Sequence, residues 1–288
     1  MSHTILLTVI VLVSVGLAAA VILYFVSQKF KVYEDPRIDI IQEALPGANC
    51  GGCGFTGCRN FAEALVKADT LDGLNCPVGG ATVMADIAKI LGKEAVVSEP
   101  LVAVVRCQGS YEYRPRTSAY DGVKDCRIAH LLYGGETDCH YGCLGYGDCV
   151  EACQFGAMYM DEKTGLPVVI DEKCVACGAC VKACPRNIIE LRKKFKTDRK
   201  IYVSCVNCDR GGPARKACKV ACIACNKCFN VCKFGAITIQ NNLAYIDSFK
   251  CTLCRKCVTE CPTNAIIELN FPPRKAAEEA VKETLTQK

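Results

Sequence analysis

The stretch CVACGACVKACP, residues Cys174–Pro185, sets the pattern on which the second half of this chain is built. Its four cysteines are separated by two, two and three residues, and a proline follows the last of them. The same pattern returns in CTLCRKCVTECP, residues Cys251–Pro262, 77 residues further along the chain. A third run, CIACNKCFNVC at Cys222–Cys232, lacks only the proline. One cysteine pattern is repeated, which predicts a fold made of repeated units.

The repeat extends well beyond these runs. The segment CQFGAMYMDEKTGLPVVIDEKC at 153–174 parallels CKFGAITIQNNLAYIDSFKC at 232–251, and CPRNIIEL parallels CPTNAIIEL. In the first copy one run is irregular, because CHYGCLGYGDCVEAC, residues Cys139–Cys153, has gaps of three, five and three residues. Aligned by the repeat, Tyr146 stands where the second copy has Cys225. The chain therefore contains two copies of one unit, and the first departs from the pattern in one run.

The regular pattern is the one with which bacterial ferredoxins hold [4Fe-4S] clusters: three thiolates bind one cluster and the fourth binds its partner cluster. Zinc sites instead use two CxxC pairs separated by a longer spacer. The sequence therefore predicts an α+β fold with two tandem 2[4Fe-4S] ferredoxin-like units, over residues 99–195 with a leading strand and 196–272. The ligand sets predicted from the regular runs are Cys153, Cys174, Cys177 and Cys180; Cys222, Cys225, Cys228 and Cys261; and Cys232, Cys251, Cys254 and Cys257.

The irregular run needs a different fourth ligand. A phenol is not a plausible substitute for a thiolate, so Tyr146 is excluded, and Cys139 is the nearest spare sulfur. We therefore assign Cys139, Cys143, Cys149 and Cys184 to the fourth ferredoxin-type cluster. The alternative is that the first copy has lost this cluster.

A fifth site is predicted ahead of the repeats, in a small domain over residues 36–98. The segment CGGCGFTGC and a later cysteine give the spacing C-x2-C-x4-C-x17-C, formed by Cys50, Cys53, Cys58 and Cys76. Intervening glycines allow the tight turns with which one loop can bring three thiolates together. A zinc knuckle is the alternative, since CxxC alone does not distinguish the metal.

The N-terminus predicts a membrane anchor over residues 1–28. Ile5–Val26 is a run of 22 uncharged residues, which at about 1.5 Å per residue spans a hydrocarbon core of roughly 30 Å. A signal peptide, the alternative, has a basic start and a shorter apolar stretch. Lys29 and Lys31 follow the run, so the cysteine-rich part is expected in the cytoplasm, where structural disulfides are disfavoured.

Composition narrows the function further. The 288 residues include 25 cysteines but only three histidines, so hydrolytic or nucleophilic catalysis is disfavoured, and a net charge of +5 is too small to indicate nucleic-acid binding. Dinucleotide, P-loop and nucleophile-elbow motifs are absent from the sequence. Residues 273–288 are expected to form an exposed helix. The composition therefore favours an electron carrier without a nucleotide site of its own.

Five cysteines remain outside these sets: Cys107, Cys126, Cys205, Cys208 and Cys218. Cys107 and Cys205 each end a short apolar strand ahead of a ferredoxin unit. We hypothesise a sixth cluster held by Cys107, Cys126, Cys205 and Cys218. The alternative is that all five are ordinary buried or surface thiols, because cysteine packs well as a small apolar group.

Taken in order, these motifs resemble the B subunit of the Rnf complexes over essentially the whole chain. Those are membrane ferredoxin:NAD oxidoreductases that couple electron flow to sodium or proton transport. The resemblance implies a translocase subunit in the cell inner membrane that takes electrons from reduced ferredoxin and passes them to other Rnf-type membrane and peripheral subunits. A membrane-anchored polyferredoxin serving a hydrogenase or another reductase is the alternative function. The second ferredoxin unit, from Cys218 on, exceeds the shortest family members.

Overall fold

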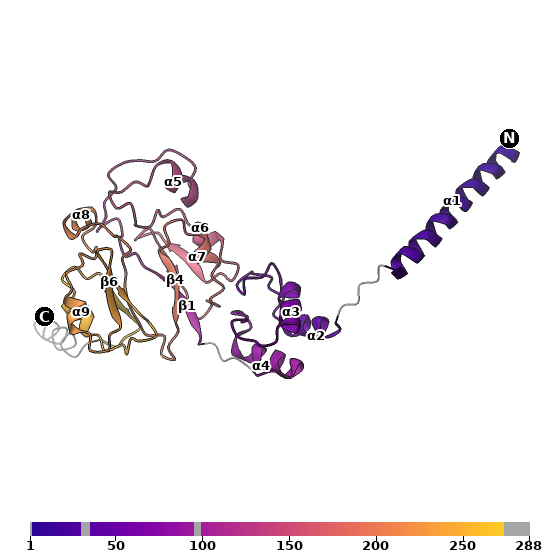
Figure 1. Ribbon diagram of the computed structural model, residues 1–288. Coiled ribbons are helices and arrows are strands. Elements are labelled where there is room, and N and C mark those ends of the chain that lie inside the picture. Colours follow the sequence, from indigo (N-terminus) through magenta and orange to yellow (C-terminus); the bar gives the residue numbers. More distant parts are fainter. Residues whose placement is uncertain (1, 30–34, 95–98, 274–288) are drawn as a thin grey trace, which may run out of the picture.

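The computed structural model describes residues 2–29, 35–94 and 99–273. Its parts follow one another in chain order: the N-terminal helix α1, a small helical domain, and two ferredoxin-like units side by side (Figure 1). The exposed helix predicted over residues 273–288 lies outside the described residues, apart from its first residue. Lys31, which contributes to the expected membrane orientation, also lies outside them.

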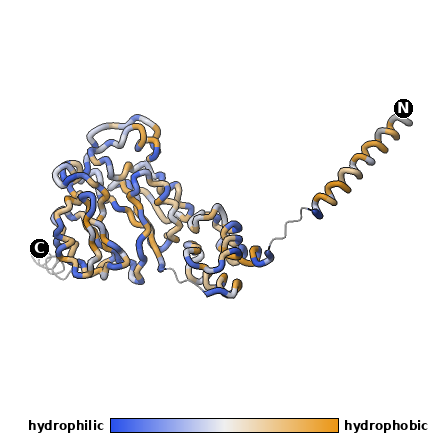
Figure 2. The backbone as a smooth tube through the Cα atoms, viewed as in Figure 1, coloured by the Kyte–Doolittle hydropathy of each residue, from blue (hydrophilic) through white to orange (hydrophobic). Residues whose placement is uncertain are grey.

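Helix α1, Ser2–Lys29, is hydrophobic along nearly its whole length (Figure 2). Its apolar side chains are exposed, from Ile5 to Val26, and no polar face interrupts them. The stretch Ile5–Lys29 has 25 residues, about 38 Å of helix, which is long enough and apolar enough to cross a membrane. Signal sequences at an N-terminus meet the same criterion of length and composition.

The helical domain packs three amphipathic helices around one small core. They are α2 (Arg37–Ala44), α3 (Cys58–Lys67) and α4 (Gly80–Leu91). Ile41, Phe61, Leu65 and Ile87 are almost fully buried between them. The Asn49 side chain accepts a hydrogen bond of 2.8 Å from the Cys58 backbone N–H at the start of α3. This bond fixes the cysteine loop to the helix that follows it.

Each ferredoxin-like unit consists of two antiparallel strand pairs and short helices. In the first unit the leading strand pairs with the last one, and the pairs are β1 (Leu101–Val105) with β4 (Ile189–Lys193) and β2 (Met158–Asp161) with β3 (Leu166–Val169). The second unit repeats this order with β5 (Lys200–Val203) and β8 (Ile266–Leu269), and with β6 (Ile237–Gln240) and β7 (Leu243–Ile246). The predicted α+β fold with two tandem units is confirmed.

Short helices carry the cysteine runs of both units. They are α6 (Asp148–Glu151) and α7 (Ala179–Ala183) in the first unit, and α9 (Lys227–Val231) and α10 (Lys256–Glu260) in the second, preceded by α8 (Gly211–Ala217). All four residues of β5 are buried, and two of them contact the first unit: Lys200 pairs with Asp171, and the Tyr202 ring lies against Arg192. Thus the two units share an extensive internal boundary.

Residues 108–138, for which the sequence predicts no regular element, rise above the first unit and contain helix α5, Cys126–Leu132 (Figure 1). Asp125 caps this helix, since its carboxylate accepts hydrogen bonds from the backbone N–H groups of Arg127 and Ile128. Helix α5 therefore begins at Cys126, which belongs to none of the five ligand sets predicted from the sequence.

Candidate iron–sulfur centres

Three cavities are each lined by the four cysteines of one predicted ligand set. Their volumes are about 320, 330 and 330 Å³. The sets are Cys50, Cys53, Cys58 and Cys76; Cys232, Cys251, Cys254 and Cys257; and Cys222, Cys225, Cys228 and Cys261. The cavities are lined mainly by thiols and apolar side chains, a donor set suited to an iron–sulfur cluster.

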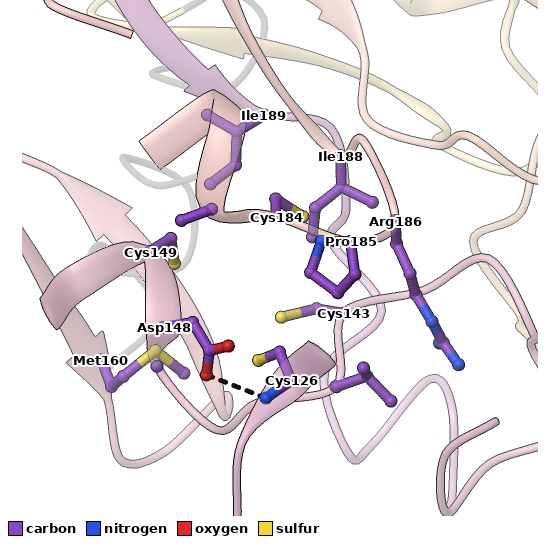
Figure 3. Close-up of a pocket in the computed structure, with 13 residues that line it drawn as sticks. Cys126, Cys143, Asp148, Cys149, Met160, Cys184, Pro185, Arg186, Ile188 and Ile189 are labelled. Carbon is purple, nitrogen blue, oxygen red and sulfur yellow. Dashed lines mark hydrogen bonds between the residues drawn. The ribbon is translucent and has the colours of Figure 1, made fainter. Parts of the chain in front are cut away.

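A fourth cavity, of about 360 Å³, lies in the first ferredoxin unit and is also lined by four cysteines. They are Cys126, Cys143, Cys149 and Cys184, and their sulfurs face the same space in Figure 3. Cys139, which the spacing of the run predicts for this site, does not line it. The first copy therefore has four thiols around this cavity, but one of them comes from helix α5.

Two contacts explain how Cys126 reaches the cavity. Its backbone N–H donates a hydrogen bond of 2.8 Å to the carboxylate of Asp148, which begins helix α6 of the cysteine run (Figure 3). Burial raises the pKa of the Cys126 thiol, while hydrogen bonds from the backbone at Asp148 and Tyr146 lower it. The thiol thus lies against the loop position at which the second copy has its own cysteine. In this geometry the fourth thiol at the cavity comes from outside the run, in place of the Cys139 that the spacing predicts.

The remaining regular set, Cys153, Cys174, Cys177 and Cys180, also gathers in the first unit. Burial and the neighbouring thiols of Cys174, Cys177 and Cys153 raise the pKa of Cys180 to about 11. Backbone N–H groups point at two of these sulfurs, from Ala157 to Cys153 at 3.3 Å and from Ala103 to Cys174 at 3.5 Å. Bonds of this kind stabilise thiolate ligands and help to set the potential of a bound cluster.

A separate group of cysteines lies at the boundary between the two units. Burial raises the pKa of Cys218, a backbone hydrogen bond from Val220 lowers it, and the neighbouring thiols of Cys107 and Cys139 raise it further. Cys205 belongs to the same group, because Cys107 also raises its pKa. Asn207 links two members, since its backbone N–H donates to Cys205 Sγ at 3.4 Å and its side chain to Cys139 Sγ at 3.6 Å.

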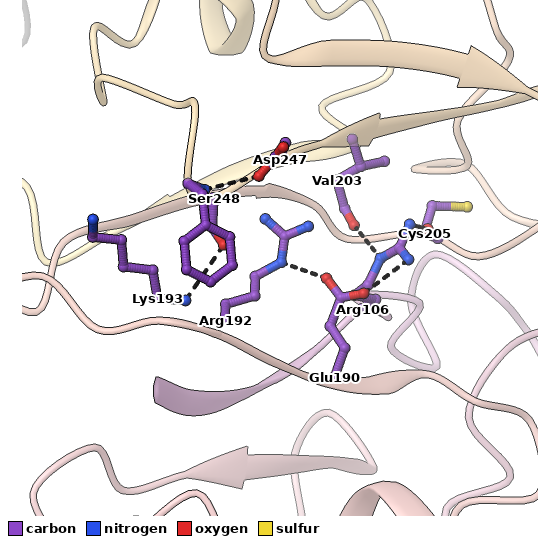
Figure 4. A network of polar contacts seen from close by, with 9 residues as sticks. Arg106, Glu190, Arg192, Lys193, Val203, Cys205, Asp247 and Ser248 are labelled. Atoms are coloured by element: carbon purple, nitrogen blue, oxygen red, sulfur yellow. Dashed lines mark hydrogen bonds and ion pairs between the residues drawn. The ribbon is translucent and has the colours of Figure 1, made fainter. Parts of the chain in front are cut away.

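The position of this group follows from Arg106, which precedes Cys107 at the end of strand β1 (Figure 4). The buried guanidinium donates hydrogen bonds of 3.3 Å to the backbone carbonyls of Val203 and Cys205, at the end of strand β5. It also pairs with Glu190 at 3.2 Å. One side chain of the first unit therefore fixes both strand ends of the boundary, and with them Cys107 and Cys205.

Two further arginines, the buried Arg114 and the half-buried Arg186, hold the loop between Cys139 and Cys143. Arg114 donates to the carbonyl of Cys143 at 2.7 Å, and Arg186 donates to the carbonyls of Cys139, at 3.3 Å, and Gly142. Burial lowers the pKa of Arg186, as does Arg114, whereas the nearby thiols raise it. Arginine side chains are not deprotonated in proteins. Their positive charges therefore lie between the fourth cavity and the boundary group.

Burial keeps many of these thiols protonated when no metal is bound. It raises the pKa of Cys149, Cys205 and Cys257 to about 12, against an ordinary value near 8.5. Within the described residues, no three His, Cys, Asp or Glu side chains converge closely enough to bind a single metal ion. A [4Fe-4S] cluster bound at these thiols would have to displace their protons, because the thiolate is the ligand.

Neighbouring sites are connected through pairs of cysteines. Cys50 adjoins Cys177, and a Cβ atom on Gly52 would lie only 2.9 Å from the Cys177 carbonyl oxygen. Within the first unit Cys149 adjoins Cys180, and Cys143 adjoins Cys107, whose sulfur accepts from the Cys143 backbone N–H at 3.5 Å. In the second unit the linked pairs are Cys205 with Cys222 and Cys228 with Cys257. The cysteine groups form one unbroken series.

Comparison with known protein families agrees with this arrangement. The 4Fe-4S dicluster domain family matches residues 138–188 and again 221–265, one match in each ferredoxin-like unit. An Fe-S cluster family matches residues 45–77, which contain the four cysteines of the N-terminal domain. Iron–sulfur binding is thus supported for all three cysteine-rich parts of the chain.

Whole-chain relatives are similar along almost the full length. The B subunit of the Na(+)-translocating ferredoxin:NAD(+) oxidoreductase complex of Acetobacterium woodii is 45% identical, over 92% of this chain and 78% of the relative. The B subunit of an ion-translocating oxidoreductase complex of Methanosarcina acetivorans is 42% identical, over 92% and 99%. The B subunit of the proton-translocating complex of Clostridium ljungdahlii is 40% identical, over 92% of each chain. The resemblance noted in the sequence is confirmed: this chain belongs to the family of B subunits of ion-translocating, Rnf-type oxidoreductase complexes.

Proposed function

We propose that this chain is the electron-relay subunit of a membrane-bound, ion-translocating ferredoxin:NAD oxidoreductase, accepting electrons from reduced ferredoxin and passing them to membrane redox subunits. The observation that carries the proposal is the unbroken series of cysteine groups from the second ferredoxin unit to the domain beside the anchor. A [4Fe-4S] cluster, when bound, supplies one-electron chemistry to such a site. The side chains supply the thiolates, exclude water and donate hydrogen bonds to sulfur.

Five of the proposed sites have clear ligand sets. Four keep the cysteines predicted from the spacing, and the fifth uses Cys126, Cys143, Cys149 and Cys184. The fit rests on the donor set, because each of the four cavities has four thiols and similar volume, between about 320 and 360 Å³. These sites account for about 20 iron atoms per chain, at four per cluster.

We also propose a sixth cluster at the boundary between the units, held by Cys107, Cys139, Cys205 and Cys218. This set differs from the one hypothesised from the sequence in one member. Cys139 replaces Cys126 here, and Cys126 replaces Cys139 at the fourth cavity. All but Cys107, which is half-buried, are buried, and each has another member of the group or a shared Asn207 contact beside it. Cys208 stays outside, with its thiol 3.6 Å from the Val206 carbonyl. Without this group, no cysteine site would lie between those of the two units, and electrons would have to cross the boundary without a cluster on the way.

Partners and placement follow from the family and the anchor. Further subunits of an Rnf-type complex are the expected partners, since the relatives are named as subunits of such complexes. Lys29 at the end of α1 supports a cytoplasmic position for the cysteine-rich part. The coupling ion is left open, because one relative is named for sodium and another for protons.

The proposal is tested with the full chain purified anaerobically in detergent. Reduced ferredoxin should be oxidised by the chain with no added flavin or nucleotide, and iron should be about 24 per chain if the sixth site exists. An iron content of about 20 per chain would rule out the sixth cluster and leave the proposed function standing. Failure to accept electrons from ferredoxin, or reduction of NAD by this chain by itself, would overturn the proposed function.

A further inference from the structure

Only two of the 25 cysteines are exposed, and both belong to the second ferredoxin unit. They are Cys225 and Cys254, one from each of the unit's two cysteine sites. Every cysteine of the first unit and of the N-terminal domain is buried or half-buried. Since electron tunnelling becomes slower with distance, the second unit is where a carrier in solution can approach a site most closely.

The same unit differs from the rest of the chain in charge. Residues 205–271 contain nine Lys and Arg against four Asp and Glu, whereas residues 126–193 contain seven against nine. The N-terminal domain, residues 36–94, contains five against seven. Opposite potentials on two surfaces accelerate encounter and select the partner. The second unit is thus suited to a negatively charged protein, and the other two parts are not.

One surface combines exposure, charge and an aromatic side chain. The cavity of Cys232, Cys251, Cys254 and Cys257 is also lined by Phe234 and Lys256, and Phe234 is 51% exposed. Lys233 and Lys256 are both exposed and make no ion pair with any described residue. An exposed aromatic ring beside unpaired lysines is typical of an interface centre with a charged rim.

The place of this site in the series supports the same surface. The second unit has two cysteine sites. The site that contains Cys222 is next to the boundary group, because Cys222 adjoins Cys205. The site with Cys254 is the other one, and it is reached from the Cys222 site through Cys257 and Cys228. The opposite end of the series is the N-terminal domain, which follows the membrane anchor (Figure 1). The Cys254 site is therefore the terminal site of the series away from the anchor.

We propose that a small acidic ferredoxin docks on the face formed by Lys233, Phe234, Cys254 and Lys256. The inference rests on the proposed relay function and adds to it the place where electrons arrive. Lys233 and Lys256 would face carboxylates of the donor, and Phe234 would be covered by it. Association should then weaken as salt is added, because exposed charge pairs are screened.

The test compares two double charge reversals in the full chain. Lys233→Glu with Lys256→Glu changes the proposed face, and Lys163→Glu with Lys173→Glu makes the same change in charge at exposed lysines of the first unit. Binding of an oxidised acidic [4Fe-4S] ferredoxin is measured by titration calorimetry at low salt, and its electron transfer by stopped flow. Iron content and dithionite-reduced spectra of both variants should equal those of the unaltered chain.

The Lys233/Lys256 variant should bind the ferredoxin about ten-fold or more weakly and lose the salt dependence, while the Lys163/Lys173 variant stays within about two-fold. Equal affinity in all three proteins, or equal loss in both variants, would overturn the docking face. If the unaltered chain neither binds ferredoxin nor takes electrons from it, the proposed function fails together with the face. If both variants accept electrons from ferredoxin as fast as the unaltered chain does, the proposed docking face is wrong but the proposed function stands.

Discussion

At the scale of single residues, the fourth cavity depends on Cys126 supplying a sulfur that the cysteine run lacks. Tyr146, at the corresponding place in the run, is half-buried, and burial raises the pKa of its phenol, so it stays neutral and a poor ligand. The Asp148 carboxylate holds the start of α5 against the loop. One hydrogen bond between distant segments therefore completes the ligand set.

Cys126→Ala and Cys139→Ala are expected to remove about four irons each, and the double variant about eight, because the two thiols belong to different sites. Iron and acid-labile sulfide analysis of the purified proteins measures this. Tyr146→Phe is the control and should keep all its iron. If the double variant loses no more iron than Cys139→Ala alone, the two cysteines do not serve separate clusters.

Arg186 is expected to raise the potential of the clusters beside it, because its half-buried positive charge favours the more negative, reduced state. Its pKa is influenced by the thiols of Cys139, Cys143 and Cys107. Arg186→Gln should therefore shift a midpoint potential in the negative direction, on the order of tens of millivolts. Redox titration followed by electron paramagnetic resonance measures the shift. Arg37→Gln is the control, since that side chain is 48% exposed and pairs with Asp35, away from the cysteine sites; an equal shift in both variants would contradict a specific role for Arg186.

At the scale of elements, the spacing of cysteines and apolar residues along the chain predicted those elements that are formed by residues close together in sequence. The regular runs place three cysteines on one turn-rich loop, and the strands at 101–105 and 200–203 were visible as short apolar segments. Helix α5 was not predicted, because its seven residues stand in a segment without periodicity. The exchange of Cys126 and Cys139 that we propose could not be read from the spacing either, since it depends on Asp148, Asn207 and Arg106 joining distant segments.

The contact between the N-terminal domain and the first ferredoxin unit depends on Gly52. A Cβ atom there would lie 2.9 Å from both the Cys177 carbonyl oxygen and Pro77 Cγ. Gly52→Ala should therefore push the domain away from the unit while leaving iron content unchanged. We expect weaker magnetic coupling between the two reduced sites and slower reduction of the N-terminal one by ferredoxin.

Gly212→Ala is the matched change, because a Cβ atom at Gly212 has no neighbour within 4 Å. Its reduction kinetics should equal those of the unaltered chain. If Gly52→Ala behaves in the same way as Gly212→Ala, the domain contact does not control the distance between the two sites.

At the scale of the whole molecule, the chain is a row of cysteine sites that begins at an exposed basic unit and ends in the small domain that follows the apolar helix α1 in the sequence (Figure 1). The two ferredoxin-like units repeat one cysteine pattern, yet their boundary differs from their interiors. It is formed by Arg106, Glu190 and the strand ends of β1 and β5 (Figure 4). This boundary places the group of Cys107, Cys139, Cys205 and Cys218 between the units, which makes the row continuous.

The central claim is that six sites in one chain form a continuous relay, and counting electrons tests it most directly. The full chain, oxidised and free of flavin, is titrated anaerobically with reduced ferredoxin of low potential, with absorbance and electron paramagnetic resonance recorded at each step. We predict uptake of about six electrons per chain, one for each [4Fe-4S] cluster, with no NADH formed when NAD is present. Uptake that stops after about two electrons, leaving the first unit and the N-terminal domain oxidised although dithionite reduces them, would contradict the account.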